Sequence, residues 1–134
     1  MADGGDGEWR ATTDGSGAVL VQRRVGGRWC RWTQVRPSPV HGRGLFADRA
    51  FRPGDEIGWY DGLELHPACV PDYESSMVME LQEPVRRFVD GAYGRRGLVQ
   101  FANHSESAPN AGVRPDGRLQ ALVALRRGQE VLWD

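Results

Sequence analysis

Lysine is absent from this sequence and cysteine is scarce. All 17 basic residues among the 134 are arginines, so the chain has no lysine side chain of its own that could be modified. Two cysteines, Cys30 and Cys69, are too few for a disulfide scaffold or for a zinc site made of four thiolates. No apolar run approaches the roughly 18 residues that a membrane-spanning helix needs. These absences exclude a disulfide-stapled fold, a thiolate zinc centre and a membrane span.

An excess of charge is also missing. The 17 basic residues face 18 acidic ones, for a net charge of −1, so no bulk field attracts nucleic acid. Direct nucleic-acid binding is therefore not expected, and a small β-rich nucleic-acid binder is only a remote alternative. The first eight residues are acidic and glycine-rich, without the basic and apolar regions of a secretory signal. They predict a flexible tail and an intracellular protein, in the nucleus or the cytoplasm, with no membrane association.

The length and the apolar content predict one domain with one core. Hydrophobic residues make up 40% of the 134 positions. The 18 glycines and 8 prolines indicate many tight turns between short segments. The fold class that this pattern favours is a β-rich α+β domain.

A β-hairpin is predicted near the N-terminus. Two apolar-rich runs between Ala18 and Gln34 flank Gly26-Gly27, and paired glycines supply the positive φ of a primed hairpin turn. Pro37 and Pro39 then block a helix. We place a boundary near Arg36, so that residues 1–36 form a tail and hairpin extension and residues 37–134 form the main unit.

Short strands are predicted for most of the main unit, at 44–47, 56–60, 88–91, 119–125 and 130–134. Residues 63–87 differ in character. Tyr73, Met77, Leu81 and Val85 recur every four residues, a spacing that favours a helix ending before Pro84.

Local motifs for catalysis or ligand binding are weak when each is taken alone. His66 and Cys69 have the spacing of half a zinc site, but no second pair matches them. Ser105, His104 and Asp90 could be imagined as a hydrolytic triad, but no nucleophile elbow is present. The five tryptophans could form an aromatic cage for a methylated ammonium, although core packing is the more common role: Trp9, Trp29, Trp32, Trp59 and Trp133.

Read in order, seven short motifs resemble a known family. They are Gly42-Arg43-Gly44-Leu45-Phe46-Ala47, Pro53-Gly54-Asp55-Glu56-Ile57, Trp59-Tyr60-Asp61-Gly62, Phe88-Val89-Asp90-Gly91, Phe101-Ala102-Asn103-His104-Ser105, Pro109-Asn110 and Gly128-Gln129-Glu130-Val131-Leu132-Trp133-Asp134. Their order resembles the SET domain of protein lysine methyltransferases from Val35 to Asp134, in particular the small free-standing SET proteins of viruses and microbes. The resemblance implies small β-sheets in which the C-terminal segment is threaded through a loop near Asn103-His104-Ser105.

The resemblance also implies a methyl donor and a site. S-adenosylmethionine would lie on one face, and a protein lysine, possibly of a histone tail, would enter from the opposite face. The donor would contact Gly42, Arg43, Gly44, Tyr60, Asn103 and His104, and Tyr60 and His104 are the candidate catalytic residues. Residues 63–87 match the family's substrate-selecting insert, with Met77 and Met79 as candidate substrate contacts.

Three further expectations come from the end of the sequence and from the missing flanks. Trp133 matches an aromatic position that contacts the substrate and limits the number of methyl groups. The family's last catalytic tyrosine would follow Asp134, the final residue of the sequence. Either the sequence was cut before this tyrosine or the protein does without it, so a catalytically impaired SET-fold module that binds a peptide or partner protein stays open as the alternative function. The family's zinc-binding cysteine clusters are missing, so a homodimer or the hairpin would have to close the lysine channel.

Overall fold

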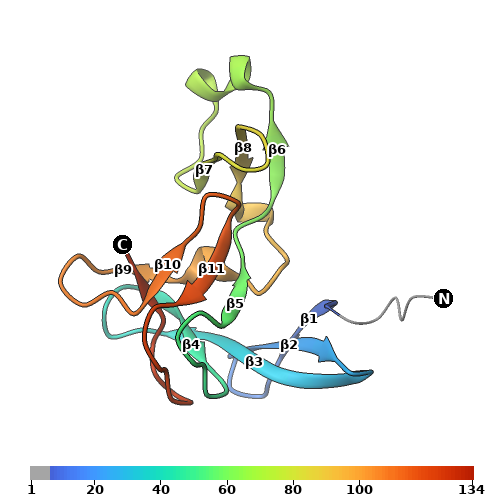
Figure 1. Ribbon diagram of the computed structural model, residues 1–134, viewed down its shortest axis with the longest axis vertical. Coiled ribbons are helices and arrows are strands. Elements are labelled where there is room, and N and C mark those ends of the chain that lie inside the picture. The colour runs from blue at the N-terminus through green and yellow to red at the C-terminus, as the bar shows by residue number, and fades with distance from the viewer. Residues whose placement is uncertain (1–6) are drawn as a thin grey trace.

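The computed structural model describes residues 7–134, and it divides them between three small sheets (Figure 1). The first sheet is antiparallel in the order β1-β2-β3-β4, with bounds Trp9–Thr13, Val19–Val25, Arg28–Pro37 and Arg43–Ala47. The predicted hairpin is confirmed as β2 and β3, and Gly26 and Gly27 have φ of 58° and 77° at its turn.

The predicted boundary near Arg36 falls inside β3. Residues of this strand pair with β4 from Thr33 to Pro37, so backbone hydrogen bonds cross the boundary without a break. The division of the chain at Arg36 stays a prediction. Of the predicted tail, residues 1–6 lie outside the described part of the chain, while Gly7 and Glu8 hydrogen-bond with the backbone of Arg24. These two residues therefore extend the first sheet rather than forming a free tail.

The second sheet has the order β5-β11-β10-β12-β9. The bounds of these five strands are Glu56–Trp59, Arg118–Ala121, Ala111–Val113, Leu132–Trp133 and Asn103–His104. Strand β12 lies between β9 and β10, which are consecutive in the chain, and runs parallel to both. This insertion of the C-terminal strand between two consecutive strands confirms the threaded arrangement. Such an arrangement is rare among proteins.

Apolar side chains from the first two sheets share one core. Leu45, Ile57 and Val131 are fully buried in it, together with Leu119. They come from β4, β5 and β11 and from the residue before β12. The core therefore holds the threaded C-terminal segment against both sheets.

Residues 63–90, which we call the insert, form the third sheet and stand apart at the top of Figure 1. Its order is β6-β8-β7, with bounds Leu63–Leu65, Arg87–Asp90 and Val78–Leu81, and the 3-10 helix η1 covers Pro67–Asp72.

The prediction of a helix across residues 63–87 is wrong. Val78 to Leu81 pair with β8, and Pro71 lies inside the single 3-10 segment. A spacing of four residues is also a multiple of the two-residue period of a strand, so the apolar pattern alone did not distinguish the two structures.

Other predicted segments are shorter than expected. β11 ends at Ala121, and Leu122 and Val123 are exposed.

Two further 3-10 helices, η2 (Gly91–Tyr93) and η3 (Val99–Phe101), join the insert to β9. Between residues 7 and 134 no helix is long and apolar enough to cross a membrane.

Candidate functional site

The turn before β4 is held in place by Asn103. The side-chain nitrogen of Asn103 donates to the carbonyl oxygens of His41 at 3.0 Å and Arg43 at 3.3 Å. Gly42 lies between them with a φ of 46°, and a side chain placed there would meet no other heavy atom within 4 Å. The turn is therefore ordered by a strand some 60 residues away and is open on its outer side.

Gly44 is the point where the two segments come closest. Glu130 accepts hydrogen bonds from Asn103 at 2.9 Å and from the Ser38 hydroxyl at 2.8 Å. A Cβ atom at position 44 would collide with the Glu130 carboxylate and would lie 3.1 Å from the Asn103 nitrogen. Glycine at this position lets the threaded segment pack directly against β4.

His104 lies on the outer side of the same crossing, next to the end of the chain. Its Nε2 is 2.9 Å from the carboxylate of Asp134, and its ring meets the Trp133 ring edge-on, with centroids 5.7 Å apart. Half of the His104 side chain is exposed, whereas Trp133 is partly buried and donates from its indole nitrogen to Ala102. The structure thus brings His104 and Trp133 together in an accessible position.

Asn110 secures the threaded strand from its other side. Its side chain donates to the carbonyl of Glu130 at 2.9 Å and accepts from the backbone of Leu132 at 2.8 Å. Asn110 belongs to one of the seven motifs, but the sequence predicted no role for its side chain. An asparagine suits this position because its amide can both donate and accept. One side chain thus satisfies the carbonyl of Glu130 and the N–H of Leu132 in the C-terminal segment.

A second group of predicted site residues lies around Tyr60, at the β5 edge of the five-stranded sheet. Its hydroxyl donates to the carbonyl oxygen of Met77 in the insert. Its ring packs against Gly91 so closely that a side chain at position 91 would collide with it. Burial, and next the charge of Asp90, raises the pKa of Tyr60, so the hydroxyl keeps its proton at neutral pH.

Asp90 connects this group to the rest of the insert. Its buried carboxylate accepts from the hydroxyls of Tyr73 at 2.7 Å and Ser75 at 2.9 Å and from the backbone of Ala92 at 3.0 Å. Burial alone raises the pKa of Asp90, but the hydrogen bonds outweigh it and leave that pKa below its ordinary value. The hydrogen bond from the Tyr73 hydroxyl to Asp90 raises the pKa of Tyr73 to about 12. Sequence reasoning missed this network, although an aspartate ending a strand before glycine was a signal for it.

The two predicted substrate contacts in the insert are half-buried. Met77 carries the carbonyl that Tyr60 and the backbone of Gly91 share, and Met79 pairs with Val89 in the sheet. No contact recorded for residues 7–134 joins these methionines to His104 or Trp133. The structure thus assembles the predicted site as two groups, at opposite edges of the five-stranded sheet.

The weaker local motifs are dispersed in the structure. Asp90 lies in the third sheet, whereas His104 pairs with Asp134 and the Ser105 hydroxyl accepts from Ala108. His66 accepts from Ala68 and caps η1. No group of three or more potential metal ligands occurs in the part of the chain that is described. The tryptophans do not gather into one cage, since Arg23 stacks on Trp9 while Arg96 stacks on Trp59.

Comparisons with known proteins identify the architecture. No family model and no curated protein matches the sequence. Among solved structures, the methyltransferase domain of human PR domain-containing protein 2 matches with a TM-score of 0.59 and 15% identity, over 77% of this chain and 76% of that chain. The fold is a SET-domain fold.

A second solved structure agrees. A chain of a humanized mutant of the Chaetomium thermophilum Polycomb Repressive Complex 2 matches with a TM-score of 0.59 and 20% identity. The match covers 75% of this chain and 14% of that one. At these identities the likeness establishes the SET fold alone. It confirms the resemblance and the fold class, and leaves the roles of individual residues as predictions.

Within the SET fold, the threaded crossing unites the predicted donor contacts Gly42, Gly44, Asn103 and His104. Arg43 lies beside them, but its guanidinium reaches back to the carbonyl of Gly17 at 3.1 Å. The open backbone at Gly42 and the exposed ring of His104 fit a ligand that lies along this edge. The amide of Asn103, by contrast, is already occupied by protein atoms.

Proposed function

We propose that this chain is a protein lysine N-methyltransferase that uses S-adenosylmethionine. The single observation that carries the proposal is the threaded SET crossing, in which Asn103 orders an open turn at Gly42 beside the exposed ring of His104. S-adenosylmethionine would supply a methyl group carried on a positively charged sulfur. The Gly42 turn and His104 would hold it, since the backbone at Gly42 is free of side-chain cover.

The chain's own residues would prepare the lysine at the second group. A lysine ammonium has an ordinary pKa near 10.4, and it must give its proton to water before its nitrogen can act as a nucleophile. The apolar bodies of Met77 and Met79 disfavour the charged form and lower that pKa. The Tyr60 hydroxyl stays protonated and donates to the Met77 carbonyl oxygen. This hydrogen bond fixes the positions of the hydroxyl oxygen and the carbonyl oxygen.

A calorimetric titration with S-adenosylmethionine tests the donor site. We expect saturable binding to the native chain and a loss of about tenfold in affinity in His104→Ala. His66→Ala is the matched control, because His66 is an exposed histidine of the insert and lies outside the crossing. An equal effect of both substitutions, or no binding at all, would contradict the proposal.

A methyl-transfer assay tests the reaction. The acceptor is a histone-tail peptide, compared with the same peptide in which every lysine is arginine. Because the chain contains no lysine, lysine automethylation cannot contribute background. We expect label on the lysine peptide only, and a rate about tenfold or more lower in Tyr60→Phe at a saturating concentration of the donor.

The alternative function is a SET-fold module that binds a peptide without methylating it. The observation that favours it is that the Asn103 amide is spent on His41, Arg43 and Glu130. Absence of donor binding in the first titration, together with saturable binding of the histone-tail peptide in a second calorimetric titration, would select this alternative. A histone as substrate, a homodimer, and a location in the nucleus or the cytoplasm stay predictions.

A further inference from the structure

A cavity of about 470 Å³ lies away from both groups of predicted site residues. It opens between the first sheet and the turn that joins β4 to β5. Its lining is mostly charged and consists of Arg23, Trp32, Arg49, Ala50, Arg52, Asp55 and Glu56. A volume of this size lies within the range of small-molecule pockets in proteins. None of these residues was predicted to belong to a site together.

Arginine side chains surround the tryptophan in this cavity. The guanidinium carbon of Arg49 lies 4.3 Å from the centroid of the Trp32 ring, and that of Arg23 lies 5.2 Å from it. Trp32 is only 7% exposed. Both guanidinium groups therefore stack on one buried indole ring, while the Arg49 side chain as a whole stays exposed.

The acidic residues of the lining leave two of the arginines unpaired. Glu56 forms an ion pair with Arg23, and the carboxylate of Asp55 accepts from the backbone of Arg52 at 2.8 Å. In the described chain no ion pair reaches Arg49 or Arg52, and the Nε of Arg49 bonds only to the carbonyl of Ala50. The lining thus carries three positive and two negative charges.

Two buried donors of the cavity wall also lack partners. Neither the indole nitrogen of Trp32 nor the Nε of Arg23 has a hydrogen bond to any residue from 7 to 134. The Nε atoms of Arg24, Arg87 and Arg118 are also buried without a partner, but only Trp32 and Arg23 line the cavity. A buried N–H without an acceptor costs free energy, which an acceptor bound in the cavity would relieve. The missing partner is an acceptor, and the unpaired guanidiniums indicate that it is negatively charged.

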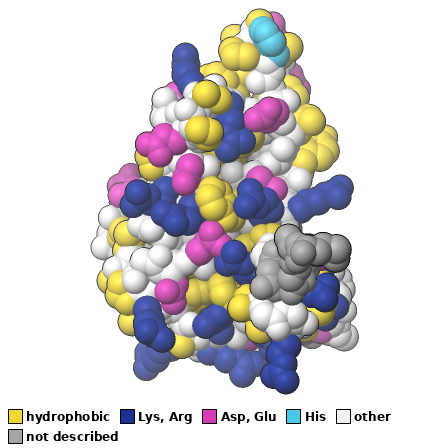
Figure 2. Space-filling view, turned by 45° about the vertical axis from the view of Figure 1, so that its right-hand side comes forward, with side chains coloured by type: hydrophobic (Ala, Val, Ile, Leu, Met, Phe, Trp, Pro, Cys, Tyr) yellow, Lys and Arg dark blue, Asp and Glu magenta, His cyan; other side chains and the backbone are white. Residues whose placement is uncertain are grey.

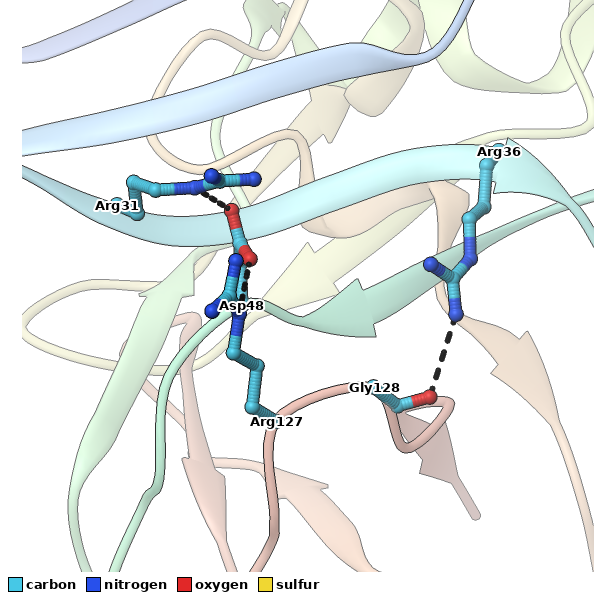
Figure 3. A network of polar contacts seen from close by, with 5 residues as sticks. All are labelled: Arg31, Arg36, Asp48, Arg127 and Gly128. Carbon is cyan, nitrogen blue, oxygen red and sulfur yellow. Dashed lines mark hydrogen bonds and ion pairs between the residues drawn. The ribbon is translucent and has the colours of Figure 1, made fainter.

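The neighbouring surface adds further positive charge. Arg31 and Arg127 share the buried carboxylate of Asp48, at 2.7 Å and 3.1 Å, while Arg36 bonds to the carbonyl of Gly128 (Figure 3). One carboxylate balances only one of the two arginines that it binds. Figure 2 shows arginine side chains gathered along the lower edge of the molecule. The near-neutral total charge therefore conceals local clusters of arginine, although none of Arg31, Arg36 and Arg127 lines the cavity itself.

We propose that this cavity binds a phosphate group, either as free phosphate or on the phosphorylated side chain of a peptide. The lining carries one excess positive charge and two guanidiniums without an ion-pair partner, which suits a group that carries a charge of about −1.5 to −2 at neutral pH, as a phosphate monoester does. The forked donors of Arg49 and Arg52 suit the several oxygens of a phosphate better than a point charge would. The proposal does not rest on methyl transfer.

Nuclear magnetic resonance of the indole and guanidinium N–H groups tests the site. Inorganic phosphate is titrated at constant ionic strength, and the signals of Trp32 and Arg23 are followed. We expect saturable shifts with a Kd below about 1 mM, and a loss of about tenfold or more in affinity in Arg49→Gln and Arg52→Gln. Both arginines are exposed, so melting curves of these variants verify that they fold.

Arg86→Gln is the matched control, because it removes the same charge from the exposed ion pair with Glu80 in the insert. It should leave the phosphate affinity unchanged. Shifts that do not saturate, or that fall equally in Arg86→Gln, would overturn the proposal and indicate an adventitious ion only. Acetate binding as tightly as phosphate would also overturn it.

A short peptide with one phosphoserine, and its unphosphorylated form, distinguish the two sources of phosphate. Tighter binding of the phosphorylated peptide than of inorganic phosphate identifies a phosphorylated side chain as the ligand. Equal or weaker binding of that peptide identifies free phosphate. Either result supports the site, because both require the same two arginines.

Discussion

The body of the molecule and the insert are stabilised in different ways. In the body, residues 7–62 and 91–134, an apolar cluster that includes Leu45, Ile57 and Val131 joins two sheets. In the insert, residues 63–90, only Leu81, Val89 and Asp90 are buried. One of these three is a carboxylate. The body, with its threaded crossing, is therefore stabilised mainly by hydrophobic burial. The insert buries few apolar side chains and depends also on the polar network around Asp90.

The same truncation should have different consequences in the two regions. Leu45→Ala removes a fully buried side chain of the shared core and should lower the free energy of unfolding by about 4 kcal/mol. Leu81→Ala should cost about 2 kcal/mol and act mainly on the insert, since Leu81 lies outside that cluster. Denaturant melts measure the first effect. Hydrogen exchange of the amides of β7 and β8, compared with those of β4, measures the second. Equal loss of protection in β4 and β7 after Leu81→Ala would contradict the division.

Asp90→Asn should weaken the insert more than Leu81→Ala does, though less than Leu45→Ala weakens the body. The amide nitrogen that replaces one carboxylate oxygen cannot accept from the hydroxyl of Tyr73 or Ser75, so a buried donor loses its partner. We expect a loss of about 3 kcal/mol in the stability of the insert. Chemical denaturation monitored by near-ultraviolet circular dichroism of the tyrosines measures it. Leu45→Ala variants with and without Asp90→Asn should show additive losses; strong coupling between these distant sites would count against independent regions.

Acid should weaken the insert through the carboxylate of Asp90. The pKa of Asp90 is lowered in the folded state, so its contribution is fully present above its ordinary pKa near 3.8 and is lost as pH falls through the lower folded value. The stability difference between the native chain and Asp90→Asn should therefore be constant from about pH 5 to 7 and shrink below about pH 4. Denaturant melts of both proteins across this range measure it. A difference that stayed constant down to pH 2 would contradict the assignment.

The smallest effect is expected from an exposed ion pair of the insert. Arg87 lies 3.3 Å from Glu64, and two thirds of the Glu64 side chain is exposed. Arg87→Gln should change the free energy of unfolding by less than about 0.5 kcal/mol, because water screens such pairs. A thermal melt measures it. A change comparable to that of Asp90→Asn would show that the insert relies on surface charge rather than on its buried carboxylate.

Local features of the chain could be predicted from the sequence with good accuracy. Gly26-Gly27 and Gly54 form the expected turns with positive φ, and the hairpin follows from the apolar runs beside the first of them. The order of short motifs led to the SET fold, and with it to the threaded C-terminal strand. These features depend on backbone sterics and on patterns within a few residues, which are contained in any short stretch of sequence.

Other features depended on which segments meet in space. The four-residue spacing around Met77 suits a helix or a strand, and pairing of β7 with β8 decided for the strand. The roles of Asn103 and Asp90 follow from partners that lie up to 62 and 17 residues away in the chain.

The sequence by itself determined the N-terminal hairpin, the glycine turns and the order of the motifs, since these depend on neighbouring residues. Only the tertiary structure brought Trp32 and Arg49 together with Arg52 around one cavity, within a chain whose net charge is −1. Charge adds along the sequence without regard to position, whereas an electrostatic site depends on which charges the fold places within a few ångströms of one another.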